Sequence, residues 1–208
     1  MTEWNEKLPT TVDRRLLPAG RIMYRMSEPA TCCLLVIRGN LISTVAAPSG
    51  QCVALALYGP GDMLGSSALL DRDAVRLTTM TCLTEVEAVV YRHGATADES
   101  CNDLIRRCVS ELLAETKLLG DIVASSAYCS AEQRIRRAVH RLASHLYRAA
   151  GGPSVTLPLT QEQIGSFAQV SRPTTNSVLS TAADRGLLRL RRGAITVVDM
   201  GAIASWAR

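Results

Sequence analysis

Residues 157–188 read LPLTQEQIGSFAQVSRPTTNSVLSTAADRGLL, and the spacing of polar and apolar side chains predicts two short helices joined by one turn. Thr160 and Gln163 have capping-box spacing, in which each side chain satisfies a backbone N–H at the start of a helix. Ser171 is a second N-cap candidate, and Pro173 fits only the first turn of a helix. The stretch therefore predicts a helix-turn-helix.

The second predicted helix leaves polar side chains outward at its start. Only this exposed N-terminal part of a recognition helix reaches base edges in the major groove of DNA. Arg172 is the best base-reading candidate, because its planar guanidinium can donate two hydrogen bonds to a guanine. The residues that begin the two helices suit phosphate oxygens. The DNA-binding candidates of this pair are Thr160, Ser171, Arg172, Thr174, Thr175 and Ser177.

Two strand-like runs follow the helix pair. Residues 187–190 and 194–198 flank Arg191, Arg192 and Gly193, which we interpret as a three-residue hairpin loop with glycine at the left-handed position. Two arginines at a hairpin tip beside a helix-turn-helix indicate a wing. We therefore add Arg191 and Arg192 to the DNA-binding candidates.

Basic charge is concentrated in the C-terminal part of the chain. The formal net charge is only +4, but residues 130–208 hold eleven arginines and four acidic residues, a balance of +7. Residues 1–129 hold the other 12 basic and 15 acidic residues, a balance of −3. Such a split is the electrostatic signature of a nucleic-acid-binding module attached to a second module.

Length and composition predict a folded cytoplasmic protein with room for two modules. The chain has 208 residues and 47% hydrophobic content, which suffices for a core in each module. We expect neither a membrane span nor a signal peptide, because no apolar run is long enough and the first ten residues are polar. Seven cysteines without CxxC pairs favour no disulfide framework and no metal site.

The N-terminal part has the short strands and frequent turns of an all-β module. Turn signals occur at Arg38-Gly39-Asn40 and at Gly59-Pro60-Gly61-Asp62. This texture suggests a barrel or jelly roll. The predicted strands cover Thr31–Ile37, Gln51–Leu57, Leu77–Cys82 and Glu85–Tyr91.

Helical periodicity replaces the strand pattern from residue 98 to about residue 126. Apolar positions spaced alternately by four and three residues predict a coiled-coil dimer seam, and the alternative is a helix buried within one subunit. Leu104, Cys108, Leu113 and Ile122 flank the seam and are expected to pack on the β module. A second helix is predicted at about residues 131–148. The seam consists of Ile105, Val109, Leu112, Thr116, Leu119 and Val123.

This order of parts resembles the cyclic-AMP receptor protein and fumarate-nitrate regulator (CRP/FNR) family of bacterial transcription factors. The resemblance is carried by VIRG at 36–39, GPGDMLG at 59–65, LTQ at 159–161 and VSRPT at 170–174. It implies an α+β fold with a cyclic-nucleotide-binding-like β-roll (residues 1–97), a dimerisation helix (98–128) and a winged helix-turn-helix (129–208). It also matches Arg172 to the family's base-contacting arginine, whereas Ser177 stands where many members carry a second arginine.

The roll departs from the family's cyclic-nucleotide binders. These members follow the roll glycine with a glutamate and carry an arginine-serine pair for the cyclic phosphate, but here Ser66 follows Gly65 and Leu77 follows Arg76. Arg72 or Arg76 could supply the phosphate charge if the loop were shifted. We predict control by something other than cyclic AMP, and no iron–sulfur or haem cofactor.

Thiol chemistry remains an alternative signal. Cys32 and Cys33 lie on one predicted strand and point to opposite faces, so they are not expected to pair. Cys101 and Cys108 share a helix face, and their counterparts could approach one another across a dimer. Simple packing of these cysteines and a constitutive binder without any effector stay open as well.

These observations predict a homodimeric regulator that reads a palindromic operator in double-stranded DNA. RNA polymerase is a candidate partner, and the small-molecule or redox effector is unknown. The alternative is a ligand-binding regulatory module that acts on a protein partner. No phosphate loop, nucleophile elbow or metal-ligand spacing indicates an enzyme.

Overall fold

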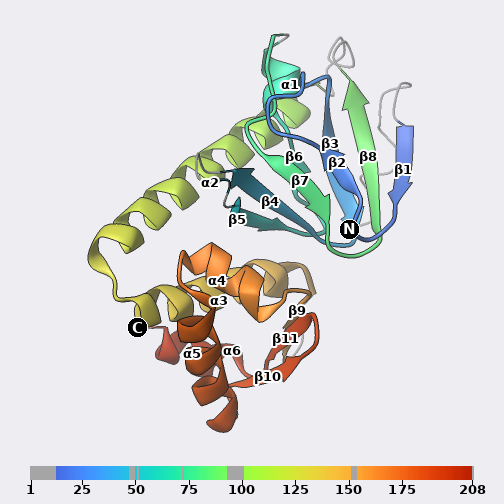
Figure 1. The fold of residues 1–208 in the computed structure, drawn as a ribbon. Coiled ribbons are helices and arrows are strands. Elements are labelled where there is room, and N and C mark those ends of the chain that lie inside the picture. Colours follow the sequence, from blue (N-terminus) through green and yellow to red (C-terminus); the bar gives the residue numbers. More distant parts are fainter. Residues whose placement is uncertain are drawn as a thin grey trace. The chain divides into compact units, whose positions relative to one another are not determined.

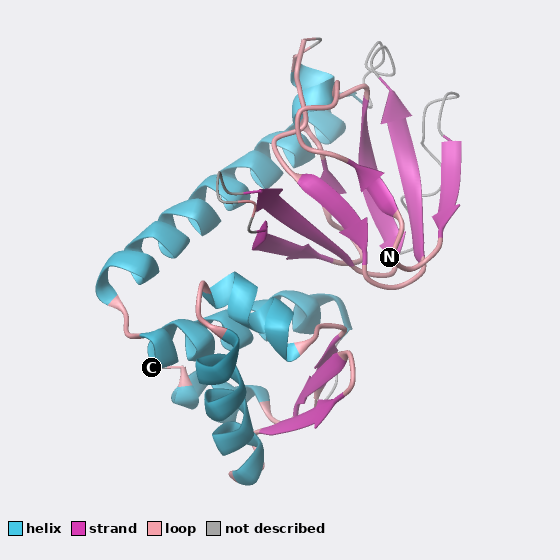
Figure 2. Cartoon of the chain, in the orientation of Figure 1, coloured by secondary structure: helices cyan, strands magenta, loops and turns pink. Residues whose placement is uncertain are grey.

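The computed structural model describes residues 13–46, 50, 52–71, 73–92, 101–150 and 154–207. The chain divides into two compact units, Met1–Leu41 with Gly59–Leu119, and Ile42–Tyr58 with Gly120–Arg208. The first unit holds a β-sheet core and most of one long helix, and the second is mostly helical (Figures 1 and 2). The domain boundaries at residues 97 and 128 stay a prediction.

The main sheet of the first unit is antiparallel, with Cys33 opposite Tyr91 and Leu35 opposite Val89. Its strand order is β1 (Asp13–Leu17), β8 (Val86–Arg92), β3 (Cys32–Arg38) and β6 (Met63–Leu64). In the same unit, β2 (Ile22–Tyr24) pairs with β7 (Thr79–Cys82), and a short helix α1 covers Ser67–Leu70.

The core of this unit forms where the two central strands are apolar on consecutive residues. Four residues in a row are buried in β3 and another four in β8, so both faces of the sheet are covered at its centre. The four predicted strands match β3, β5, β7 and β8, except that Gln51, the first residue of the second predicted strand, lies outside the described residues. The predicted α+β class with an N-terminal β-sheet domain is confirmed.

The long helix α2 runs from Cys101 to Tyr128 and has two apolar sides. Leu104 and Cys108 are buried with side chains of the sheet, as predicted. Leu113 is 65% exposed, so its predicted packing on the β module is wrong. Leu113 comes directly after the seam residue Leu112, and on a heptad this position borders the seam instead of facing the roll.

The predicted seam lies along the surface of the single chain. Five of its six residues are exposed, with Val123 reaching 68% and Leu112 alone half-buried. An apolar stripe of this kind on one helix is typical of a surface that pairs with another chain. Dimerisation therefore stays a prediction to be tested below.

The second unit is built around the amphipathic helix α3. Ile135, Val139, Leu142 and Leu146 are buried on one face of this helix, as predicted. The three-stranded antiparallel sheet of this unit has the order β10-β11-β9. The elements of the second unit, besides the end of α2, are β4 (Leu41–Ala46), β5 (Cys52–Tyr58), α3 (Ala131–Ala150), β9 (Val155–Leu157), α4 (Gln161–Ala168), α5 (Arg172–Asp184), β10 (Leu188–Arg191), β11 (Ala194–Val197) and α6 (Met200–Trp206).

Strand β5 is linked to α4 although 112 residues separate the bonded positions in the sequence. The Ser166 hydroxyl accepts a hydrogen bond from the Ala54 N–H at 2.8 Å and donates one to the Cys52 carbonyl at 3.2 Å. The second compact unit is therefore discontinuous in sequence.

Three elements of the second unit were not predicted, and strand β4 is the first of them. Strand β9 adds a third strand through Leu157 opposite Ile195, and α6 begins where the Asp199 carboxylate accepts from the Ala202 N–H at 2.6 Å. Among the described residues, no helix is long and apolar enough to cross a membrane.

Candidate nucleic-acid interface

The first helix of the predicted pair starts with a complete capping box. The Gln163 N–H donates to the Thr160 hydroxyl at 3.1 Å, and the Thr160 N–H donates to the Gln163 side-chain oxygen at 2.8 Å. The predicted capping box is confirmed, with Thr160 as the N-cap and α4 beginning at the next residue, Gln161. Thr160 itself is exposed, so its backbone and hydroxyl lie at the surface next to a helix N-terminus.

The turn between α4 and α5 depends on one left-handed residue and one glycine. Gln169 has φ 53° and ends α4. Gly165 allows the two helices to meet, because an ideal Cβ there would lie 2.8 Å from the Thr175 hydroxyl and 3.0 Å from the Val170 carbonyl. These contacts fix the angle at which α5 leaves the turn.

The same contacts bury Thr175, which was predicted to face outward. Its exposed fraction is 0%, and its hydroxyl donates to the Ser171 carbonyl at 2.9 Å. The placement of Thr175 among DNA-facing residues is therefore wrong. A threonine can occupy an inward helical position because the carbonyl four residues earlier accepts from its hydroxyl.

The start of α5 presents the remaining candidates on an open surface. Ser171, Arg172, Thr174 and Ser177 are all exposed. Ser171 occupies the N-cap position, as predicted, but its hydroxyl bonds to the Thr174 hydroxyl at 3.0 Å and does not cap a backbone N–H. The Arg172 guanidinium makes no hydrogen bond or ion pair with the described residues, so its donors are available to a partner.

The hairpin after α5 is tighter than predicted. Arg191 pairs with Ala194 in the ladder, so Arg192 and Gly193 alone form the turn, with Gly193 at φ 74°. The prediction of a three-residue loop is therefore wrong, because Arg191 belongs to β10. Arg191 and Arg192 are both exposed, which is the property that the predicted wing requires.

Two further exposed arginines extend this basic surface, and the sequence reasoning passed over them. Arg185 follows the end of α5, and Arg189 points outward from β10. The alternation LRLR in β10 is the signal that could have identified Arg189, because alternate strand residues face opposite sides. We define the reader surface as Arg172, Thr174, Ser177, Arg185, Arg189, Arg191 and Arg192.

In the roll, Arg76 is buried beside the turn at Gly65. Its guanidinium lies 4.1 Å from the centroid of the Tyr24 ring, and Nη2 donates to the Cys32 carbonyl at 2.6 Å. An ideal Cβ on Gly65 would meet Nη1, so a larger residue there would displace the end of the Arg76 side chain. Arg76 thus lies next to the roll glycine, whereas Arg72 lies outside the described residues.

The donors of Arg76 are only partly used. Nε and Nη1 are buried and have no hydrogen-bond partner in the described part of the chain. Ser66, which follows Gly65, carries no carboxylate, and Leu77, which follows Arg76, is an exposed apolar side chain.

Cys33 and Cys108 are fully buried together in one apolar cluster of β3 and α2. The hydrogen bond between the two thiols is the main cause that raises the pKa of Cys33 and lowers the pKa of Cys108 to about 7. Because Cys108 is enclosed by its own chain, the expected approach of Cys108 to a dimer partner is wrong. The side chain of Cys101 lies outside the described residues.

Glu111, one turn further along α2, is a carboxyl group in an unfavourable site. Burial, followed by the negative charges of Asp62, Glu115 and Cys108, raises its pKa to about 8. A pKa raised on folding contributes stability that is fully present below the unfolded value of about 4.5 and is lost as the pH rises through about 8.

Glu111→Gln is therefore expected to raise the free energy of unfolding at pH 9 by ~1–3 kcal/mol, allowing for solvent screening, and to change it little at pH 5. Urea denaturation of the wild type and the variant at both pH values measures the effect. Glu85→Gln, at an exposed carboxylate of the same unit, is the control. If both variants show the same pH dependence as the wild type, Glu111 does not titrate in this range.

Family models match both parts of the chain. A cyclic nucleotide-binding domain model matches residues 14–98, and a Crp-like helix-turn-helix domain model matches residues 134–206. The matched ranges together include the roll glycine, the capping box and the hairpin of the reader surface.

Similar proteins of known role span nearly the same length. The "CRP-like cAMP-activated global transcriptional regulator" of Mycobacterium tuberculosis is 29% identical over 198 residues, which cover 92% of this chain and 86% of that protein. The "Cyclic AMP receptor protein" of Thermus thermophilus is 26% identical over 185 residues, which cover 88% and 83%.

Solved structures show the same fold. FixK2 from Bradyrhizobium japonicum has a TM-score of 0.76 at 16% identity and covers 93% of this chain and 96% of its own. A transcriptional regulator of the CRP family from Thermus thermophilus has a TM-score of 0.71 at 18% identity, with coverage of 93% and 96%.

Proposed function

Because the chain belongs to the CRP/FNR family of transcription regulators, we propose that it acts as a homodimer that binds a palindromic DNA operator and is not controlled by cyclic AMP. The two subunits pair through the α2 seam. Each subunit places the start of α5 in a major groove and the β10–β11 wing beside the DNA backbone.

The observation that carries the proposal is the state of Arg172. Its guanidinium is exposed in the first turn of α5 and has no partner among the described residues, while the inward side of the same helix is closed by buried Leu179 and Ala182. A free planar guanidinium at this position can meet O6 and N7 of a guanine. Thr160 and Ser171, exposed at the helix starts, suit backbone phosphates.

The proposed palindromic operator follows from the two-fold symmetry of the proposed dimer. Two identical readers related by a two-fold axis require two half-sites in opposite orientation, with the recognition helices about 34 Å apart. The exposed apolar seam of α2 supplies a self-complementary surface for this pairing.

The proposal that cyclic AMP is not the effector rests on Ser66 and Leu77. A serine in place of a glutamate removes the charged acceptor for the ribose hydroxyl, and Leu77 offers no hydroxyl to the cyclic phosphate. An increase of operator affinity on addition of cyclic AMP would contradict this part of the proposal. A parallel assay with and without reductant tests the thiol alternative.

Arg172→Ala is the direct test of base reading. On an operator selected from random DNA by the wild type, we expect a loss of about 1–3 kcal/mol, roughly 5- to 150-fold, because a bidentate contact is removed. Fluorescence anisotropy on the selected operator and on random DNA measures this loss. Affinity for random DNA should change little.

Two variants serve as controls in that assay. Arg192→Ala should weaken binding to both DNAs alike and flatten the dependence on salt, because a wing arginine contacts phosphate. Arg25→Ala removes the same charge from an exposed turn of the first unit and should leave both affinities unchanged. Equal losses for Arg172→Ala on the two DNAs would refute its base-reading role.

A further inference from the structure

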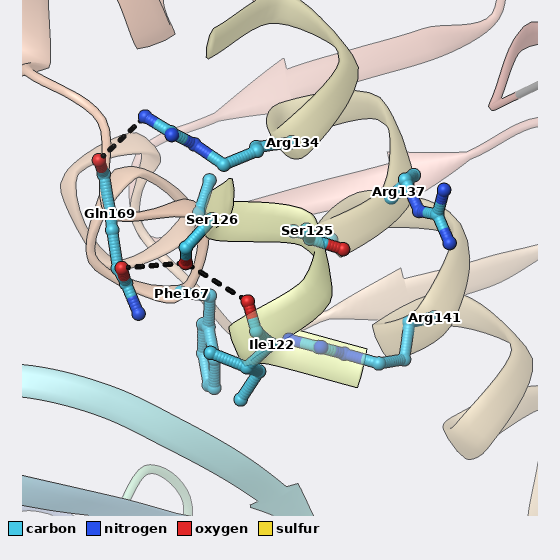
Figure 3. Close-up of a pocket in the computed structure, with 10 residues that line it drawn as sticks. Ile122, Ser125, Ser126, Arg134, Arg137, Arg141, Phe167 and Gln169 are labelled. Carbon is cyan, nitrogen blue, oxygen red and sulfur yellow. Dashed lines mark hydrogen bonds between the residues drawn. The ribbon is translucent and has the colours of Figure 1, made fainter. Parts of the chain in front are cut away.

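An open surface cleft lies between the end of α2, α3 and the end of α4, all within the second compact unit (Figure 3). Three arginines of α3, Arg134, Arg137 and Arg141, line it together with Ser125. The arginine spacing of three and four residues places the three side chains on one face of the helix. The reader surface defined above contains none of these residues.

The charge in this cleft is poorly balanced. Its lining contains no acidic residue. Burial, helped by the positive charge of Arg137, lowers the pKa of Arg141, and Asp121 is the acid that opposes this effect. Glu132, the acid at the start of α3, is already paired with Arg136. The described lining of the cleft therefore holds three guanidinium groups and no carboxylate.

Arg134 and Arg137 make few hydrogen bonds with the described residues. Arg134 donates from Nη2 to the Gln169 carbonyl at 3.2 Å, but its Nε is buried and has no partner among the described residues. Arg137 has a weak contact from Nη1 to the Cys129 sulfur at 3.8 Å. In Figure 3, Ser125 is drawn to the left of Arg137 and above the Arg141 side chain.

Four apolar residues, Ile122, Ala138, Phe167 and Ala168, complete the lining together with the polar residues Ser126 and Gln169. A concave site with apolar walls and a few convergent polar groups is the usual design of a small-molecule site. Guanidinium groups in fork geometry are the preferred partners of phosphate oxygens. The cleft thus combines the wall of a ligand site with the charge of an anion site.

We propose that this cleft binds a phosphate-bearing small molecule, with Arg137, Arg141 and Ser125 holding the phosphate and Phe167 lining the adjacent wall. The site lies where α2 contacts the reader. The Ser126 hydroxyl bonds to the Gln169 side-chain oxygen at 3.0 Å, and Gln169 is the left-handed residue that ends α4. A ligand here contacts both the end of the dimer helix and the turn before α5.

The test is isothermal titration of the full chain, without DNA, with inorganic pyrophosphate, with orthophosphate and with AMP, at constant ionic strength set by sodium chloride. We expect saturable binding of one anion per chain. AMP binding tighter than orthophosphate would indicate a nucleotide-like ligand that uses the apolar wall, and equal affinity would indicate the phosphate group alone.

Substitutions locate the anion. Arg137→Gln should weaken binding at least tenfold, and this variant is chosen because Arg137 is exposed and its loss leaves the core of α3 intact. Arg148→Gln, on the last turn of the same helix, and Arg192→Gln, on the wing, should bind as the wild type does. Circular dichroism confirms that each variant is folded.

Two outcomes would overturn the proposal. One is the absence of saturable binding by any of the three anions. The other is a loss for Arg148→Gln or Arg192→Gln as large as that for Arg137→Gln, which would mean general attraction to a basic protein. The assay uses no DNA, so either failure leaves the proposed operator binding untouched.

Discussion

Leu112→Asp is expected to convert the protein from a dimer to a chain of 22.4 kDa that binds its operator at least a hundredfold more weakly. Leu112 lies in the middle of the seam, between Val109 and Thr116 on the same stripe of α2. In a two-fold dimer, two aspartates would face each other in an apolar interface. An unpaired buried charge costs about 3–5 kcal/mol, and each 1.4 kcal/mol is tenfold in affinity.

Light scattering at micromolar concentration measures the mass, and anisotropy on the selected operator measures the affinity. Ala114→Asp is the matched control, because Ala114 is exposed two residues away on the side of the helix opposite the seam. It adds the same charge and should leave both the mass and the affinity unchanged. An unaltered dimer mass for Leu112→Asp would rule out the seam as the interface.

Gly39→Ala is expected to cause the largest loss of stability among single-methyl additions. Gly39 has φ 92°, and an ideal Cβ there would lie 2.1 Å from the Glu85 carbonyl oxygen and 2.9 Å from the Val86 Cα. Both obstacles are backbone atoms at the start of β8, so no side-chain rotation relieves the clash. We expect a loss of about 3–5 kcal/mol, which combines backbone strain with displacement of a central strand.

Gly20→Ala separates these two causes. Gly20 also has a positive φ, 78°, but nothing lies within 4 Å of an ideal Cβ there. Gly20→Ala should lower the free energy of unfolding only by the cost of backbone strain, about 1–2 kcal/mol. Urea denaturation of both variants gives the comparison. Similar losses for the two alanines would show that the turn at Gly39 relaxes away from Glu85.

The features that the sequence predicted best depend on residues a few positions apart in one helix. The capping box at Thr160 and Gln163 involves two side chains three residues apart, and it is present as predicted. The heptad stripe of α2 is likewise a property of one helix. Each can be recognised without knowing what packs against the helix.

The wrong predictions concern residues whose burial is determined by tertiary contacts. Thr175 is polar and was assigned to the outside, but Gly165 brings α4 close enough to bury it. Cys33 and Cys108 are far apart in the sequence, so their contact follows only from docking α2 on β3. The Asp199 cap of α6 is different, since a capping residue before a short helix is a sequence signal that was passed over.

The Ser166 link to β5 limits how this protein can be recombined with its relatives. The Cys52 carbonyl needs a donor and the Ala54 N–H needs an acceptor, and the single hydroxyl of Ser166 provides both. A chimera that takes only its C-terminal segment from another protein keeps β5 but replaces the residue at this position. Alanine there would leave two backbone groups to compete for water, and a longer side chain would not fit both. The helix pair of the reader surface is therefore not freely exchangeable between relatives, because α4 is hydrogen-bonded to a strand that lies more than a hundred residues earlier in the sequence.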